Sequence, residues 1–542
     1  MHVRPTSRLT SWKAIAAYLG RSVRTVRRWE RHEGLPVHRQ LHRKLGRVFA
    51  VQAELDAWTE SRSLRPARVH APNAVAAPPR SVAVLPFSAL EAASARLLAE
   101  GVTDELTVAL ARVGALEVVS RRSAALCGHH VGDTRAIAAR LGVRYLVEGS
   151  VQRSGARMRI SARLVDARRD VHCWAETFDG AIEDVFSIQD LIARRVVDAL
   201  AVRLTDDESR RIREPAIDSV PAYECYLRAR HEMWAWRNDA IDRAVQLLTD
   251  ALAMIGDHPR LYAALGLAHL QYREAGIDLS DRPLAAADAC CSKLLSLDPR
   301  SASGLQLRAW IAYSRGRIRA AVDDLMAAAE QEPNNADTLL LLCNCYLISG
   351  RVAAARPLLA RLLRIDPLTP ITRCMPGFAA IMDGHPDAAL EPYRQMFDMD
   401  PSNPMARLFL TWVLILNERR DDIAVLLRTL PPDQRGSLPG RLIRFLAKAA
   451  LGQPREAREA LTSEIETVAR ATDVFPRFLA QGFALIGDKD AALTWLGLAV
   501  DRGFVNYPFL AHHDPIFARW QAEPAYSALL ETVRRRWEAF DA

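Results

Sequence analysis

Four arginines and a threonine stand close together near the start of the chain: Arg24, Thr25, Arg27, Arg28 and Arg31. A guanidinium group neutralises phosphate, and it also binds the major-groove edge of guanine through two parallel hydrogen bonds. The first 65 residues contain 14 Lys+Arg and 5 Asp+Glu, a formal charge of +9, whereas the whole chain carries +8. A basic charge concentrated at one end of a chain predicts a module that faces a polyanion.

Two short helices are predicted to position these side chains. The apolar spacing of Trp12–Leu19 is that of one helix face, and Gly20 ends this helix. Ser22 is a suitable N-cap for a second helix, in which Val23, Val26 and Trp29 can point inward and the arginines point outward. Two helices joined by a tight glycine turn predict a helix-turn-helix, whose second helix enters the major groove of DNA. The sequence does not divide the arginines between bases and phosphates.

A basic stretch, a strand at Arg47–Ala50 and a helix at Val51–Thr59 follow. This order, and above all the stretch SVRTVRRWERHEGLP, resembles the winged DNA-binding domains of the MerR and phage-excisionase type. The resemblance implies a winged helix-turn-helix over residues 8–60. MerR regulators usually continue into a long dimerisation helix, but here a Pro/Ala-rich linker occupies residues 61–80. The predicted contacts to double-stranded DNA are Ser22, Arg24, Thr25, Arg27, Arg28, Arg31, Arg39, Arg43 and Lys44.

Composition narrows the remaining possibilities. A chain of 542 residues should form three or four domains, and no run of 18 apolar residues predicts a membrane span. The eight cysteines lack zinc spacing, and we interpret Cys290, Cys291, Cys343 and Cys345 as small core residues. A cytoplasmic location without metal or cofactor is therefore expected. The oligomeric state is left open.

A small α/β domain is predicted over residues 81–205, with the element order β-α-β-α-β-β-β-α and a hairpin around Ser154-Gly155. The domain resembles the TolB amino-terminal/FlgO-like domains. The resemblance rests on SVAVLPF, LAEGVTDEL, YLVEGSVQRSGARMRISARLVDARRDVHCWAETFDG and IEDVFSIQDLIARRVV. It implies an interaction or ligand-sensing unit without catalytic activity, placed in bacteria between a DNA-binding or cyclase module and tetratricopeptide repeats.

Motifs of common enzymes are not found in the sequence, which contains no GxxxxGK[ST], HExxH or GxSxG. The basic module before the α/β domain has about 60 residues, too few for a cyclase domain. The alternating residues Arg157, Arg159 and Arg163 are compatible with an anion site or with a solvated strand face. We therefore expect no enzyme.

A repeat of 34 residues organises the C-terminal part, about 219–542. Pro299, Pro333, Pro367 and Pro401 follow this period, and Gly316, Gly350 and Gly384 share it. Adding 34 to Gly384 gives Glu418, which suggests a degenerate repeat. Paired helices with this period predict a tetratricopeptide α-solenoid, because each pair leaves an apolar face that its neighbour covers.

A concave groove for a protein or peptide is predicted along the first helix of each pair. By phase from the prolines, the groove residues are Gln306, Trp310, Tyr313, Asn344, Leu347 and Phe378. An exposed aromatic ring at such a position anchors a peptide. The alternative is that Trp310 and Phe378 do not face a groove but pack against the next repeat. The pair His512-His513 with Asp514 is interpreted as packing of a closing segment.

The complete sequence predicts a multidomain, mainly α protein: a winged helix-turn-helix, a small α/β domain and a tetratricopeptide solenoid. The function predicted from this order is that of a DNA-binding transcriptional regulator with a protein-interaction region. The alternative is a non-catalytic scaffold, in which the basic N-terminal segment is a solvated helical face.

Overall fold

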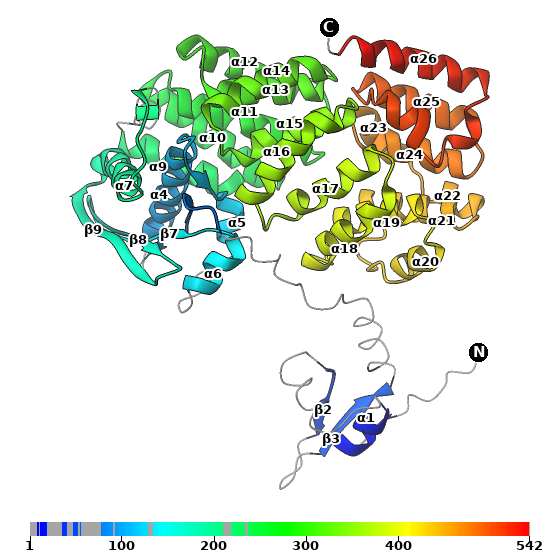
Figure 1. The fold of residues 1–542 in the computed structure, drawn as a ribbon, viewed down its shortest axis with the longest axis horizontal. Coiled ribbons are helices and arrows are strands. Elements are labelled where there is room, and N and C mark those ends of the chain that lie inside the picture. The colour runs from blue at the N-terminus through cyan, green and yellow to red at the C-terminus, as the bar shows by residue number, and fades with distance from the viewer. Residues whose placement is uncertain are drawn as a thin grey trace. The chain divides into compact units, whose positions relative to one another are not determined.

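The chain forms two compact units, residues 1–75 and 76–542, which are described separately. The structure is a computed structural model (Figure 1). It describes residues 8–9, 11–18, 26, 35–40, 47–52, 55, 77–89, 93–127, 134–206, 208–209, 217, 219–233 and 237–540.

The described residues of the first unit include a small antiparallel sheet and the helix α1. The sheet order is β1-β3-β2, so β3 is the central strand. Ile15 and Ala16 of the helix are buried together with Val26, Leu35 and Ala50, which gives this short segment its own core. The described elements are β1 (Arg8–Leu9), α1 (Trp12–Tyr18), β2 (His38–Gln40) and β3 (Arg47–Val51).

The second unit begins with the α/β part, whose strands follow the order β6-β4-β7-β8-β9, with β5 also paired to β7. The parallel strands β4, β6 and β7 are joined through helices, and β7, β8 and β9 form an antiparallel meander. The predicted hairpin is confirmed by the pairing of Ser154 with Arg157. Its elements are β4 (Ser81–Val84), β5 (Ser88–Ala89), α4 (Ala93–Ala111), β6 (Glu117–Val118), α5 (Arg121–Ala125), α6 (Thr134–Leu141), β7 (Tyr145–Ser154), β8 (Arg157–Asp166), β9 (Val171–Ala181), η1 (Ile182–Asp184) and α7 (Val185–Ala199).

The α/β part and the first repeats share one hydrophobic core. Helices α4 and α7 pack on one face of the sheet, and their buried residues continue into Tyr223, Leu248 and Leu261 of the first repeat helices. At Gly101 of α4, an added Cβ would lie 2.4 Å from a methyl group of Leu227. The glycine therefore lets α4 approach α9 closely, and the boundary near residue 205 does not separate two independent cores.

Helix pairs fill the remainder of the second unit (Figure 1). The first helices of five successive pairs begin at Ala302, Ala336, Pro370, Pro404 and Leu438, 34 residues apart each time. The described part of the chain is mainly helical. The helices are α9 (Val220–Met233), α10 (Asn238–Ile255), α11 (Pro259–Glu274), α12 (Arg282–Leu297), α13 (Ala302–Ser314), α14 (Ile318–Gln331), α15 (Ala336–Ile348), α16 (Val352–Ile365), α17 (Pro370–Met382), η2 (Pro386–Ala389), α18 (Leu390–Met399), α19 (Pro404–Leu416), α20 (Arg420–Arg428), α21 (Leu438–Ala450), α22 (Pro454–Glu459), α23 (Ser463–Ala471), α24 (Phe475–Leu485), α25 (Lys489–Asp501), η3 (Phe509–His513), η4 (Ala518–Trp520) and α26 (Pro524–Glu538).

The turn within each pair takes a left-handed backbone conformation. Gly316, Gly350 and Gly384 have φ of 73°, 75° and 85°. Glu418 occupies the same place with φ of 54°, a conformation that costs a residue with a Cβ roughly 1–2 kcal/mol. The repeat that looks degenerate in sequence is therefore intact in geometry.

The C-terminal segment packs against three successive turns. An added Cβ would lie 2.7 Å from the Asp501 carbonyl oxygen at Gly316 and 2.5 Å from His513 at Gly384. Between them, Asn506 Nδ2 donates to the Leu347 carbonyl over 2.9 Å. The 34-residue period thus provides a row of contacts for the chain end, which folds back onto its own repeats.

We expect Glu418→Gly to stabilise the protein by about 0.5–1 kcal/mol. Glycine removes the strain of the left-handed conformation, but it loses more backbone entropy on folding, which offsets part of the gain. The midpoint of chemical denaturation of the full chain measures this effect. An unchanged or lower midpoint would contradict it.

Gly350→Ala should destabilise more than Gly452→Ala. Both glycines have similar positive φ (75° and 76°), but only at Gly350 would a Cβ meet neighbours, 2.8 Å from Asn506 Oδ1 and 2.9 Å from Trp537 Nε1. The difference between the two denaturation midpoints isolates the contact with the C-terminal segment, and equal losses would show that the contact is unimportant.

Candidate functional sites

The basic N-terminal unit is described only in part. Of the predicted DNA contacts, Arg39 lies in β2, where it is paired with Val48 of β3. Val26 is fully buried, as predicted for an inward residue, whereas Val23 and Trp29 lie outside the described residues. The other eight predicted contacts lie outside the described residues: Ser22, Arg24, Thr25, Arg27, Arg28, Arg31, Arg43 and Lys44. The strand that the sequence predicts at residues 47–50 is confirmed by β3. The winged helix-turn-helix itself stays a prediction.

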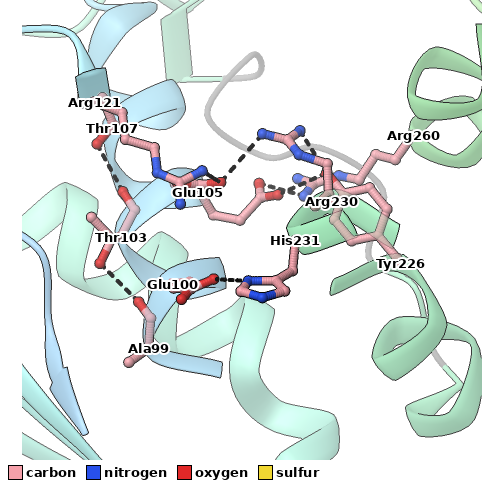
Figure 2. Close-up of polar contacts among 11 residues, drawn as sticks. Ala99, Glu100, Thr103, Glu105, Thr107, Arg121, Tyr226, Arg230, His231 and Arg260 are labelled. Carbon is pink, nitrogen blue, oxygen red and sulfur yellow. Dashed lines mark hydrogen bonds and ion pairs between the residues drawn. The ribbon is translucent and has the colours of Figure 1, made fainter. Parts of the chain in front are cut away.

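A cluster of charged side chains joins the α/β part to the first repeats (Figure 2). Asp104 of α4 forms ion pairs with Arg121 and, over 3.2 Å, with Arg230 of α9. Burial raises the pKa of the Asp104 carboxyl to about 6, although both guanidinium groups act in the opposite direction. An ion pair here holds two parts of the chain that are more than a hundred residues apart in sequence.

Neighbouring residues of α4 extend this cluster. Glu105 forms an ion pair with Arg260 of α11, and its other oxygen accepts a 3.4 Å hydrogen bond from Tyr226. Glu100 lies 3.2 Å from the His231 ring nitrogen. The carboxylates all come from one helix and the cations from the elements that face it, so the cluster fixes how α4 sits on the repeats. The space left between these side chains is about 10 Å³, too small for a ligand.

A second anchor is built on the loop that joins α16 to α17. The buried carboxylate of Asp366 accepts hydrogen bonds from the hydroxyls of Ser120 and Ser123 of the α/β part, the latter over 2.7 Å. Thr369 and Thr372 donate to the same carboxylate over 2.7 and 2.6 Å. Four donors satisfy one buried charge, which makes this junction specific in geometry.

The equivalent loop one repeat earlier provides a third anchor. Asn334 Nδ2 donates to the carbonyl oxygens of Ala111 and Leu116, over 3.2 and 2.9 Å. Glu332 forms a 3.0 Å ion pair with the buried Arg112. The loops after α14 and α16 are 34 residues apart and therefore lie side by side. Both contact the segment 111–123 of the α/β part.

The predicted groove residues do not line an open groove throughout. Tyr313 is buried, its hydroxyl donates to Asp473, and it accepts a 2.8 Å hydrogen bond from Asn344. Trp310 is half-buried and packs edge-on against Tyr313, with ring centroids 5.9 Å apart. Gln306 is half-buried as well. Leu347 is fully buried.

Two further residues, Phe378 and Asp514, are buried by packing within the repeat region. Phe378 is buried beside Trp412, with ring centroids 6.3 Å apart, so the packing alternative holds for this ring. Asp514 is buried and accepts hydrogen bonds from Gln481 and the Ile516 backbone, in agreement with its interpretation as packing of a closing segment. Of the predicted groove residues, Tyr313 and Asn344 thus form hydrogen bonds within the chain, and peptide binding by this face stays a prediction.

Several further expectations from the sequence can be compared with the structure. Cys290, Cys291, Cys343 and Cys345 are buried and free, as expected of core residues. Arg159 and Arg163 pair across strands with Asp179 and Glu148, which favours the solvated strand face over an anion site. Within the described ranges there is no group of three His, Cys, Asp or Glu able to hold a metal ion. Among the helices of the described part, none combines the length and the hydropathy that a membrane span requires.

The domain junction is the feature that sequence reasoning missed. The only available signal is the acidic residue before each repeat proline, at Glu332 and Asp366, which in sequence is an ordinary residue at a helix end. Nothing in the sequence indicates that these positions face Arg112 and Ser120, because the contacts span more than 200 residues.

Comparison with known families gives two matches. Residues 79–195 match the family described as HilA/YgeH-like transcriptional regulator, second domain. Residues 312–371 match the tetratricopeptide repeat. The α/β part is therefore similar to a domain of transcriptional regulators, whereas its residues suggested a TolB amino-terminal/FlgO-like domain.

A curated relative is named "Putative adenylate cyclase 3" and comes from Rhizobium meliloti (strain 1021). It is 35% identical over 190 residues, which are 34% of this chain and 32% of the relative. The chain thus spans 32% of the length of the curated relative that it matches.

Three of the solved structures with similar helix arrangements illustrate this likeness. A Rap protein complexed with Competence and Sporulation Factor is 12% identical, with 59% of this chain and 99% of that chain covered and a TM-score of 0.42. A tetratricopeptide protein of Parabacteroides merdae is 14% identical, with coverage of 52% and 100% and a TM-score of 0.34. TTC0263 of Thermus thermophilus is 19% identical, with coverage of 36% and 100% and a TM-score of 0.30. All three scores are below 0.5, so the repeat assignment rests on the family match and on the helix pairs themselves.

Asp104 should give the protein a measurable pH dependence of stability. Its pKa of about 6 in the folded state exceeds the ordinary value of 3.8, so the folded protein binds this proton more tightly than the unfolded chain. The stabilising contribution is complete below pH 4 and is lost as the pH rises through 6, a change on the order of 2–3 kcal/mol. Asp104→Asn cannot titrate, so the free energy of unfolding should fall less steeply for this variant than for the wild type between pH 4 and 7. Parallel curves for the two proteins would contradict the assignment.

Proposed function

We propose that the chain is a DNA-binding transcriptional regulator that acts in the cytoplasm and whose repeat region binds a partner. The observation that carries the proposal is the formal charge of +9 in the first 65 residues, on a unit with its own core, placed before a domain similar to those of HilA/YgeH-like regulators. A basic unit with its own core suits the surface of a duplex, which carries one negative charge for about every 1.7 Å of its axis.

The proposed mode of binding is that of a MerR-like winged helix-turn-helix. The second helix would lie in the major groove, with Arg24, Thr25, Arg27 and Arg28 directed at base edges or phosphates. Arg39, Arg43 and Lys44 would add contacts to the sugar-phosphate backbone, which position the protein without reading sequence. The buried Val26 supports an inward face at this position of the proposed helix.

The repeat region supplies the proposed regulatory input. The α/β part is held to the repeats through Asp104, Asp366 and Asn334 and through a common core, so the two would respond to a ligand or partner as one body. Tetratricopeptide repeats are interaction modules, which makes a protein the expected partner.

Removing two arginines should weaken DNA binding and lower its dependence on salt. For the full-length protein, Arg24→Ala combined with Arg28→Ala should reduce affinity for genomic fragments by roughly ten- to a hundredfold and reduce the slope of log K against log salt by about 2. Gel-shift titrations between 50 and 200 mM salt measure both quantities.

The matched control removes two arginines from the repeat surface. Arg282 and Arg455 are strongly exposed, with side-chain accessibilities of 86% and 93%, and their replacement by alanine changes the net charge by the same amount. Equal losses in the two double variants, or wild-type binding that salt does not affect, would favour the scaffold function, in which the basic segment has no nucleic-acid partner.

The name of the relative from Rhizobium meliloti makes a cyclase activity worth testing directly. We propose that this chain is not an enzyme, because its sequence contains no GxxxxGK[ST], HExxH or GxSxG motif. The full-length protein incubated with ATP and Mg²⁺ or Mn²⁺ should form no cyclic AMP above the buffer background. Turnover that scales with protein concentration would replace the regulator proposal with a catalytic one.

A further inference from the structure

The first turn in the row of left-handed glycines carries an insertion. Gly276 has the same backbone conformation as the later turn glycines, with φ of 70°, but it precedes Gly316 by 40 residues instead of 34. Residues 275–281 join α11 to α12, whereas residues 315–317 suffice to join α13 to α14. The insertion therefore adds a loop at the turn between α11 and α12.

The C-terminal segment leaves this turn open. A Cβ added at Gly316, Gly350 or Gly384 would meet that segment at 2.7, 2.8 and 2.5 Å, whereas at Gly276 nothing lies within 4 Å. The insertion loop, together with parts of α10, α11 and α12, instead surrounds a cavity of about 540 Å³. Asp242, on its wall, is exposed, so solvent reaches the cavity. Cavities of roughly 300–1,000 Å³ are typical of sites for small organic molecules.

Contacts within the chain hold the insertion loop in place. The backbone N–H of Ile277 donates to the Tyr272 carbonyl oxygen over 2.8 Å. Arg273 donates from Nη1 to the Leu279 carbonyl oxygen over 3.0 Å and from Nη2 to the Ala471 carbonyl oxygen over 2.6 Å, which ties the loop to α23. The cavity is therefore formed without an occupant, and binding there does not have to order the loop.

The lining of the cavity carries one unbalanced negative charge. Among the described residues no cation forms an ion pair with Asp242, whose carboxylate accepts a 2.5 Å hydrogen bond from the Tyr272 hydroxyl. The other carboxylate, Asp278, is balanced by Arg282, with Nη2 2.8 Å from Oδ2. Burial lowers the pKa of the His269 imidazole below its ordinary value, so this ring is neutral near pH 7. The remaining charge of Asp242 favours a cation in the cavity.

Aromatic and apolar groups supply the rest of the lining. The rings of His269 and Tyr272 are stacked, with centroids 6.4 Å apart and an interplanar angle of 29°. The face of an aromatic ring attracts an ammonium or guanidinium group, and the attraction grows when the group leaves water. Ile277, Pro283 and Ala286 add apolar surface to the same cavity. The lining thus combines a carboxylate and aromatic rings with room for an apolar body.

We propose that this cavity binds a ligand in which one ammonium or guanidinium group is joined to an apolar body. The cation would lie against Asp242 and the ring of Tyr272, and the apolar body against Pro283 and Ala286. A small organic amine and the lysine or arginine side chain of a partner protein both present this chemistry. The site stands whether or not the basic unit binds DNA. Only its role as the input of the repeat region rests on the proposed function.

The first test measures the binding of four probes to the full chain without DNA, by calorimetry and ligand-observed NMR at constant ionic strength. The probes are phenethylamine, its neutral analogue 2-phenylethanol, a capped tripeptide with a central arginine, and the same tripeptide with citrulline instead. At least one cationic probe should bind, and its neutral analogue should bind at least about tenfold more weakly. Stronger binding of phenethylamine identifies a small amine, and stronger binding of the arginine peptide identifies a protein side chain. Absence of binding by both cations at millimolar concentration, or equal binding of a cation and its neutral analogue, would refute the site.

The second test locates the bound probe with variants of the full chain. Asp242→Asn removes the charge at the same size and keeps an acceptor for Tyr272, so it should weaken binding of the cationic probe about tenfold. The matched control, Asp250→Asn, removes the same charge from α10 outside the cavity lining and should bind as the wild type does. Equal affinities of these two variants would overturn the proposal.

A third variant blocks the cavity without changing its charge. Ala286 is half-buried in the lining, so the ring of Ala286→Phe should fill the space and abolish binding of the cationic probe. Wild-type affinity in this variant would place the probe elsewhere on the surface and would also overturn the proposal. Because Asp242 is exposed, the comparison of the two asparagine variants decides the question even if Ala286→Phe does not fold.

Discussion

The 34-residue period is the constraint on which the second unit depends. It fixes more than the stacking of helix pairs, because it places equivalent turns and loops in straight rows along the solenoid. One row is formed by the left-handed turns at Gly316, Gly350 and Gly384, where backbone can approach closely. The other is formed by the loops that carry Asn334 and Asp366. Each row then binds a different part of the same chain.

Both rows are covered by other parts of the same chain, so part of the repeat surface is not exposed. The C-terminal segment lies on the glycine turns, and the α/β part lies on the proline loops, so repeat surface that other proteins are expected to bind is partly used internally. Tyr313 and Asn344 illustrate the result, since both hydrogen-bond within the chain's own concave face.

The interface between the α/β part and the repeats combines the ion pairs around Asp104 with apolar packing. Several ion pairs from α4 lie next to a continuous hydrophobic core, and the close approach at Gly101 brings the two together. Apolar burial supplies most of the stabilisation in such an interface, while buried ion pairs contribute little net energy and penalise wrong orientations strongly. The cluster therefore sets the orientation of the α/β part on the repeats rather than the strength of its attachment.

Local information in the sequence determined the elements of this protein. The repeat period, the turn glycines, the β7–β8 hairpin and the inward Val26 follow from spacing, turn chemistry and alternation, all of which act over a few residues. Glu418 takes the left-handed conformation of the turn glycines although it is not a glycine. The repeat period therefore predicts the turn even at this position. Only the tertiary structure decided which surfaces are covered. The contacts of Asp104 with Arg230, of Asp366 with Ser120 and of Tyr313 with Asp473 join residues more than a hundred positions apart. No local pattern encodes such pairs, since each partner alone is an ordinary polar residue on a helix or loop, and the pairing arises only when the repeats are stacked and both ends of the unit fold onto them.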